Sequence, residues 1–339
     1  MIIQNVNGER KRELDTDVLR GIGIIMMIAG HTGLTSALGW SEYIAGFYMP
    51  MFFLVSGYFF DHDKYSIKDF VKKRCKRLLV PYVFWSAFHL ILWLSMWKLH
   101  VSMEEYPLEV LKGVVWDNNQ HFPIAGALWF LTCLFITELI GYFVIKYANW
   151  VVVVIALIGL FGDVFLPLSG DSALVAFLFY FAGYYFKKYL SVWWDKVKNA
   201  KLLFRLFLLV TGNLIYMLLV QINGISNIRA CEYGKYPIVY VFHAILGTGI
   251  WWLVSYLITQ ISWNNRLWKG MVWVIIYIGR NSMLFVCLNQ LPIAVCGRFI
   301  GDSILLVFME TVVIIAGLIV LNQLILKSPF RFIIGKQSE

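Results

Sequence analysis

Two ionisable side chains, Arg20 and His31, lie within an apolar segment long enough to cross a membrane, DTDVLRGIGIIMMIAGHTG at residues 15–33. An ionisable group near the centre of a bilayer costs at least about 2.5 kcal/mol on insertion scales, so such groups usually face a protein interior or a wet cavity. Helical residues rotate by about 100° each, and eleven residues therefore return both side chains to one face, about 16 Å apart along the axis. The spacing predicts one polar stripe along the first helix.

The two residue types suit different parts of one reaction. A neutral imidazole is well suited near pH 7 to take a proton from a hydroxyl, so His31 is the candidate catalytic base. The neighbouring Gly30 and Gly33 would allow close approach of a ligand or of another backbone segment. We expect Arg20, together with Asp17, to orient groups and balance charge rather than transfer protons. For Arg20 a second interpretation stays open, because a long cationic side chain can simply extend to the headgroups.

A basic cluster, KKRCKR at residues 72–77, precedes the third apolar run. Arg74 and Arg77 are three residues apart on a predicted helical turn and would present two planar guanidinium groups to one phosphate-rich ligand, with Lys73 beside them. The alternative is a juxtamembrane cluster that sets topology and attracts anionic lipid. Both interpretations place the cluster on the cytoplasmic side.

The elements that must position these residues are long apolar helices. Hydrophobic residues make up 60% of the 339 and charged residues only 14%, which is typical of polytopic membrane proteins. Runs of the length that crosses about 30 Å of hydrocarbon predict an all-α protein with about ten transmembrane helices. They lie at 18–34, 43–60, 79–97, 124–145, 149–168, 172–190, 202–222, 237–259, 271–296 and 303–326.

The net charge of +9 would permit a nucleic-acid partner, but the distribution of the basic residues argues against one. With the N-terminus in the cytoplasm, 21 Lys and Arg residues fall on the cytoplasmic side and 5 on the opposite side. This asymmetry predicts an even number of spans with both termini cytoplasmic. We expect a single membrane domain over 1–339, in which 1–17 forms a cytoplasmic N-terminal segment and 327–339 a cytoplasmic tail.

Aromatic and neutral polar residues gather in the predicted outer loop at 98–123, which contains Trp116 and His121. Flat aromatic rings beside hydrogen-bonding groups suit a carbohydrate, and Trp129 follows at the start of the next span. An interfacial helix anchored at the headgroups by Trp and Tyr is the alternative, and the two are compatible. Trp116, His121 and Trp129 are therefore the candidate acceptor-binding residues.

Other polar residues in the predicted spans have less specific roles. Glu138 and Glu310 could pair with Arg280 or with Arg20, and the sequence does not choose between these pairings. His243 is expected to be a core residue that hydrogen-bonds a neighbour. The five cysteines show no metal-ligand spacing and are expected to act as small buried hydrophobic residues, so no metal is expected.

These residues resemble those of membrane acyltransferase family 3, the transmembrane O-acyltransferases, and the resemblance extends over nearly the whole chain. The most specific match is LDTDVLRGIGIIMMIAGH, which is similar to the family's arginine and histidine separated by ten residues, with an aspartate three before the arginine. The other matching segments are YMPMFFLVSGYFF, FVKKRCKRLLVPY, ALWFLTCLF, FAGYYFKK and IGRNSMLFVCLNQ. One departure is Asn289, which stands where many relatives have a histidine.

The resemblance implies an enzyme of the bacterial plasma membrane. Such proteins take an acyl group, usually acetyl, from cytoplasmic acyl-CoA and place it on a hydroxyl of a surface or exported polysaccharide or of its lipid-linked precursor. Polysaccharide synthesis machinery would be a further partner. Some relatives carry an appended extracytoplasmic hydrolase-like domain; this chain is expected to be a stand-alone member and to complete the transfer within the membrane domain.

Combining the geometry with the resemblance gives a specific hypothesis. The phosphates of acyl-CoA bind Arg74 and Arg77, and the pantetheine arm extends past Arg20 toward His31. His31 then acts as a general base on the acceptor, or is itself transiently acylated. The competing class is a secondary transporter or a polysaccharide export component without acyl-transfer chemistry.

Overall fold

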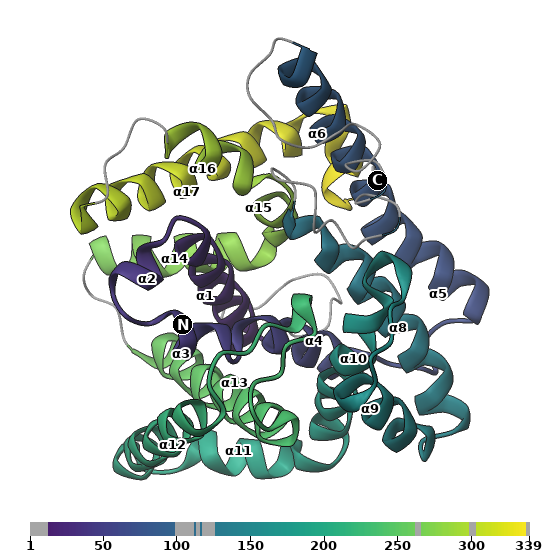
Figure 1. Ribbon diagram of the computed structural model, residues 1–339. Helices are drawn as coiled ribbons and strands as arrows, with labels where there is room; N and C mark the ends of the chain where they lie inside the picture. Colours follow the sequence, from purple (N-terminus) through teal and green to yellow (C-terminus); the bar gives the residue numbers. More distant parts are fainter. Residues whose placement is uncertain are drawn as a thin grey trace.

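The computed structural model describes residues 13–98, 112, 116, 126–261, 266–297 and 303–336, which fold into helices (Figure 1). The predicted all-α class is confirmed. The α-helices are α1 (Leu14–His31), α2 (Leu34–Ala37), α3 (Ser41–Ala45), α4 (Tyr48–Tyr58), α5 (Ile67–Arg74), α6 (Val80–Lys98), α8 (Trp129–Tyr147), α9 (Val151–Phe161), α10 (Gly170–Tyr185), α11 (Ser191–Asn199), α12 (Leu202–Asn223), α13 (Pro237–Gln260), α14 (Arg266–Arg280), α15 (Ser282–Leu288), α16 (Gln290–Cys296) and α17 (Ile304–Lys327).

Short π and 3-10 turns connect several of these helices. Two π-helical turns, Cys75–Leu79 and Phe186–Leu190, extend α5 and α10 respectively. Turns of 3-10 helix occur at Gly126–Leu128, Pro167–Ser169, Ile228–Ala230 and Pro329–Ile334. Single π turns are frequent at functional sites.

Five helical segments of the described chain are long and apolar enough to cross a membrane: Ile67–Ser95, Gly126–Tyr147, Leu202–Asn223, Pro237–Gln260 and Ile304–Lys327. The pair α14 and α15, bent by 73°, adds a sixth if it forms one span. The chain is therefore a polytopic membrane protein. The other predicted runs contain shorter helices, such as the 11-residue α4 and α9, so the number of ten spans stays a prediction.

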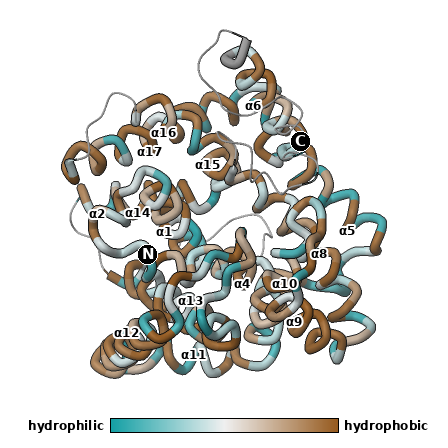
Figure 2. Tube along the Cα trace, viewed as in Figure 1, coloured by the Kyte–Doolittle hydropathy of each residue, from teal (hydrophilic) through white to brown (hydrophobic). Residues whose placement is uncertain are grey.

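Apolar side chains cover the outer helices, as expected where the solvent is lipid. In α12, Leu203, Phe207 and Leu214 are each more than half exposed, and α17 exposes Leu305 and Val313 in the same way. In the tube of Figure 2, α12 and α9 are coloured mostly as hydrophobic and lie at the periphery. Contiguous apolar surface of this extent marks a membrane or protein interface.

Glycines allow α1 to pack against α14 at very short range. A Cβ atom at Gly21 would overlap the carbonyl oxygen of Ile275, and one at Gly279 would overlap the carbonyl oxygen of Asp17. Helix interfaces in membranes commonly use small residues in this way. Because the contact lies beside Asp17, it fixes the part of α1 that carries the predicted charged residues.

The described residues near both ends of the chain are helical. α1 begins at Leu14, so the helix includes the last residues of the predicted segment 1–17. At the other end, Pro329–Ile334 forms a 3-10 helix in which Ile333 and Ile334 are buried. The carbonyl of Ile333 accepts a hydrogen bond from Trp85 Nε1 at 2.9 Å, so this part of the predicted tail packs against α6.

Candidate active site

A cavity of about 590 Å³ lies among α1, α4, α5, α8 and the junction of α14 with α15. Seven basic and four acidic side chains line it, which makes it a positively charged chamber. The basic residues are Arg20, Lys64, Lys73, Arg74, Arg77, Lys187 and Arg280. The four sequence-predicted residues Arg20, Lys73, Arg74 and Arg77 therefore face one common space, as does Asp17.

The basic cluster is positioned by a capped helix and a π turn. Ser66 begins α5 and accepts a hydrogen bond from the backbone N–H of Asp69 at 3.2 Å. Arg74 ends α5, and Arg77 follows in the π turn Cys75–Leu79. Lys73 donates a hydrogen bond to the Tyr65 hydroxyl at 2.6 Å. This arrangement presents both guanidinium groups and the lysine to the same chamber.

A buried carboxylate holds Arg74. The Nε atom of Arg74 lies 3.0 Å from Oε2 of Glu138, whose side chain is 1% exposed. Ser56 donates to the other carboxylate oxygen of Glu138 at 2.8 Å. The sequence offered Arg20 or Arg280 as partners of Glu138, and the structure instead assigns Arg74.

Asp17 pairs across the α1–α14 contact rather than along its own helix. Its Oδ2 atom accepts a hydrogen bond from Arg280 Nε at 2.7 Å. The Arg20 guanidinium lies over the Phe59 ring, 5.1 Å from its centroid. The open question about Arg280 is thereby answered, because its carboxylate partner is Asp17 and neither Glu138 nor Glu310.

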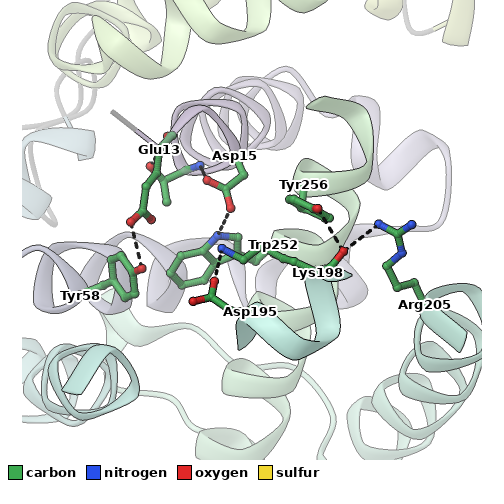
Figure 3. Close-up of polar contacts among 9 residues, drawn as sticks. Glu13, Asp15, Tyr58, Asp195, Lys198, Arg205, Trp252 and Tyr256 are labelled. Carbon is green, nitrogen blue, oxygen red and sulfur yellow. Dashed lines mark hydrogen bonds and ion pairs between the residues drawn. The ribbon is translucent and has the colours of Figure 1, made fainter. Parts of the chain in front are cut away.

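The start of α1 is held by a polar network at its base (Figure 3). Tyr58 donates to Glu13 at 3.2 Å, and Trp252 Nε1 donates to Asp15 at 3.3 Å. A separate ion pair lies nearby on α11, where Lys198 binds Asp195 at 2.8 Å. Burial, followed by the nearby charge of Asp15, raises the pKa of the Glu13 carboxyl. Glu13 also lines the basic chamber, so the network joins the start of α1 to its wall.

His31 faces a second, smaller cavity of about 140 Å³. It is the last residue of α1 and its side chain is exposed to this space instead of packing in the core. Thr32, the next residue, contacts Thr311 of α17 through their hydroxyls at 2.8 Å, which fixes the end of the helix. Trp129 and Arg229 line the same cavity.

The two cavities share a wall. Phe52, Phe130, Ser282 and Val286 line both of them, so the basic chamber and the His31 cavity adjoin. The face of α1 predicted from helical periodicity runs along both: Asp17 and Arg20 line the first, and Ile24, Met27 and His31 line the second. The predicted stripe therefore connects a cationic site to an imidazole.

A family model described as an acyltransferase domain matches residues 14–326, nearly the whole chain. The chain belongs to acyltransferase family 3. No curated protein and no solved structure matches it. This acyltransferase thus combines a basic chamber with an adjoining cavity that is lined by a histidine.

The predicted acceptor residues have different locations in this acyltransferase. Trp129 lines the His31 cavity. Trp116 is exposed and packs against Phe165 with ring centroids 6.2 Å apart. His121 lies outside the described residues.

Several polar residues support the fold and do not line the two cavities. Asn289 is buried and donates to the carbonyls of Phe285 at 2.7 Å and Val286 at 3.0 Å, so it stabilises the junction of α15 with α16. His243 is also buried and contacts Asn223 at 3.4 Å, in agreement with a core role. All five cysteines are unpaired; Cys133 and Cys287 are buried, and the other three are partly exposed.

No backbone segment lies close to the glycines next to His31, so of the two expectations the approach of a ligand stays a prediction. A Cβ atom at Gly30 would meet only the Thr35 hydroxyl, at 3.9 Å, and one at Gly33 would meet nothing within 4 Å. Gly33 instead has φ +83° and allows the chain to leave the helix.

Sequence reasoning missed several residues that the acyltransferase places in the site. Lys187 lies in the π turn Phe186–Leu190, with its Nζ atom 5.0 Å from the centroid of the Tyr58 ring, and topology alone explains the KK pair at 187–188 in the sequence. Ser282 belongs to the quoted segment IGRNSMLF but was given no role. Arg229 was counted only as one of few basic residues on the outer side, and that rarity was the available signal.

Proposed function

We propose that this acyltransferase moves an acyl group, preferably acetyl, from acyl-CoA to a hydroxyl of a surface or exported polysaccharide or of its lipid-linked precursor, in a bacterial plasma membrane. The observation that carries the proposal is the shared wall between the basic chamber and the His31 cavity. A donor with a highly charged head and a long neutral arm would place the head in the basic chamber. Its arm would then extend along the shared wall to His31, the proposed general base.

The basic chamber suits the head of coenzyme A, which carries a diphosphate and a further phosphate. Guanidinium groups bind phosphate through paired hydrogen bonds, so Arg77 and Arg74, with Lys73, are the proposed phosphate ligands. Arg77 has an exposed side chain, and the tail segment at Gly335 packs against its backbone carbonyl. Phe52 and Phe130 would contact the uncharged pantetheine arm, because they line the way inward.

The proposed chemical step takes place between the His31 imidazole, the acceptor hydroxyl and the thioester of acyl-CoA. His31 takes the proton of the acceptor hydroxyl, and the oxygen attacks the thioester carbonyl carbon. The carbon–sulfur bond breaks, an ester forms, and the departing thiolate of coenzyme A receives the proton from the imidazolium. In the second version an imidazole nitrogen attacks the thioester carbon, the carbon–sulfur bond breaks, and the departing thiolate takes the N–H proton of the acylated ring. The acceptor oxygen then attacks the acyl-histidine, the carbon–nitrogen bond breaks, and the hydroxyl proton returns to the released imidazole.

A radiolabel assay on purified protein in lipid nanodiscs tests this function. With acetyl-CoA labelled in the acetyl group and glycan extracted from cells that make the protein, we expect label on the glycan. The H31A variant should transfer label about 10²- to 10⁴-fold more slowly. Transfer at the wild-type rate by H31A would contradict the proposed base, and label that never leaves the thioester would indicate a carrier.

The same assay without glycan separates the two versions. A two-step route predicts label on wild-type protein but not on H31A after a rapid quench. Direct transfer predicts label on neither protein, because the oxygen of the acceptor is then the attacking atom.

A further inference from the structure

A third cavity, of about 410 Å³, lies where the end of α9 and the start of α10 meet the turn at 228–233. Its polar and aromatic lining residues include Asp163, Phe165, Asp171, Arg229, Cys231 and Tyr233. The charge distribution of the sequence places both segments on the side opposite the basic cluster. This outer cavity therefore lies on the side of the membrane where the proposed acceptor would be found.

Arg229 links the outer cavity to the proposed chemistry. It lines both the outer cavity and the His31 cavity, and is the residue that the two lining sets share within the described chain. Together the three cavities form a series from the basic chamber, past His31, to the outer side. The outer cavity and the His31 cavity therefore adjoin at Arg229.

Side-chain hydrogen bonds hold the segment that carries Arg229 in place. Asn223 donates to the carbonyl of Tyr233 at 2.9 Å and accepts from the backbone N–H of Tyr236 at 2.8 Å. The Asn227 side chain accepts from the backbone N–H of Arg229 at 3.1 Å. Ser172 of α10 donates to the carbonyl of Arg229 at 3.4 Å. These contacts set the position of Arg229 relative to α10.

The chemistry of the outer cavity fits a polyhydroxylated ring. The carboxylates of Asp163 and Asp171 can accept hydrogen bonds from hydroxyl groups, whereas they would repel a phosphate or a sulfate. Phe165 and Tyr233 supply flat surfaces, and Trp116 extends the first of these by packing on Phe165. Aromatic faces beside carboxylates suit a neutral sugar.

We propose that the outer cavity binds a sugar ring of the acceptor, and that Arg229 is a positioning residue that directs the acceptor hydroxyl toward His31. The proposal rests on the proposed function and identifies where its second substrate binds. Asp163 and Asp171 hold hydroxyls of the ring. Arg229 donates to an oxygen next to the reacting one.

Substitutions test the outer cavity through the Michaelis constants of the two substrates. D171N keeps an oxygen that can accept from the Ser172 backbone N–H, which Asp171 now binds at 2.7 Å, so the start of α10 should persist. We expect D171N and D163N each to raise the KM for extracted glycan about tenfold, as loss of a charged hydrogen-bond acceptor implies. The KM for acetyl-CoA should not change. The matched control D195N replaces a carboxylate on α11, where Asp195 is largely exposed, and should change neither constant.

Arg229 is tested by comparing two replacements. R229M should raise the glycan KM and lower kcat, and R229K should recover part of both, because lysine keeps the charge but not the planar donor geometry. A purely structural role would instead lower both variants' thermal stability in parallel with activity.

Cys231 provides a test that requires no change in the charged residues. In a C75S/C296S background the remaining cysteines other than Cys231 are buried. Burial raises the pKa of the Cys231 thiol, so labelling with a membrane-impermeant methanethiosulfonate is carried out at mildly alkaline pH. Labelling should block glycan acetylation while retaining binding of acetyl-CoA, and C231S should be insensitive.

The possible results separate the two proposals. A labelled Cys231 with unchanged glycan acetylation, or unchanged glycan KM in D171N and D163N, would overturn the acceptor site while leaving the proposed function intact. Absence of acyl transfer by unmodified wild-type protein would overturn the proposed function itself.

Discussion

The basic residues of the large chamber differ in how they are held. Arg74 and Arg280 each pair with a carboxylate, Glu138 and Asp17 respectively, whereas Arg77 is exposed on a π turn. A charge paired with a buried carboxylate supports structure, and one that is exposed to a cavity is available to a ligand. The two arginines that the sequence treats as equivalent should therefore respond differently to substitution.

Replacement of Arg77 should impair donor binding alone, whereas replacement of Arg74, which also pairs with Glu138, should impair folding in addition. R77A is expected to raise the KM for acetyl-CoA at least tenfold with little change in melting temperature. R74A leaves Glu138 buried without its partner, which typically costs about 3–5 kcal/mol. Thermal unfolding in detergent, followed by donor titration, checks both. Equal melting temperatures for the two variants would contradict the division of roles.

The spacing of Arg20 and His31 could be predicted because helical periodicity is a local property. The partners of Glu138 and Arg280 could not, because they come from helices far apart in sequence, and charge alone permits several pairings. Arg229 lies in a loop without periodicity, and only packing against α10 brings it to the site.

At the scale of elements, the contact between α1 and α14 determines whether Asp17 meets Arg280. The glycines at 21 and 279 allow the two helices to approach until backbone touches backbone. The sequence shows many glycines. Which two of them meet between α1 and α14 depends on how α14 packs against α1. The bend of 73° after α14 was likewise not predicted, since 271–296 reads as one apolar run.

A methyl group at residue 279 should separate α1 from α14. G279A is expected to cost about 1–3 kcal/mol through overpacking and to lower acyl transfer, because the Asp17–Arg280 pair lies at the crossing. Gly270 lies on the same helix and a Cβ there meets nothing within 4 Å, so G270A is the matched control. Similar melting temperatures and activities in both variants would argue against the close crossing.

The network at the start of α1 predicts a dependence of stability on pH. The pKa of Glu13 is raised in the folded protein, so its favourable contribution is present at acid pH and is lost as pH rises through the raised value. E13Q keeps an oxygen for the Tyr58 hydroxyl but removes the charge. Its melting temperature should exceed that of the wild type near neutral pH, and the two should converge in acid.

The positive charges of Lys187 and Lys198 lower the pKa of Glu13. Burial and the charge of Asp15 raise this pKa by more, so the net shift is upward. A difference between E13Q and wild type that is constant across pH, or that grows toward acid, would show that Glu13 does not titrate as expected.

At the scale of the whole molecule, the basic chamber adjoins the His31 cavity, and the His31 cavity adjoins the outer cavity. Composition and the distribution of Lys and Arg were sufficient to predict a polytopic all-α protein, because lipid requires apolar helices. They could not predict cavities, which depend on which helix faces meet. The packed segment at 329–334 was also missed, since its few apolar residues do not form a long run.

The predicted topology determines which cysteines can be labelled from each side of the membrane. Cys231 should react with an impermeant thiol reagent added to intact cells, and Cys75, beside Arg74, should react only after the membrane is opened. Gel-shift labelling of single-cysteine variants measures this. Reaction of Cys75 in intact cells would contradict the predicted topology.

The central claim is that an acyl group passes from coenzyme A in the basic chamber, by way of His31, to a hydroxyl on the other side. Proteoliposomes with uniformly inserted protein test it when labelled acetyl-CoA is supplied on the side of Arg77 and extracted glycan on the opposite side. We predict labelled glycan with wild type, a loss of about 10²- to 10⁴-fold with H31A, and retained acetyl-CoA binding in that variant. Glycan labelled equally well by H31A, or intact acetyl-CoA recovered on the glycan side, would contradict the account.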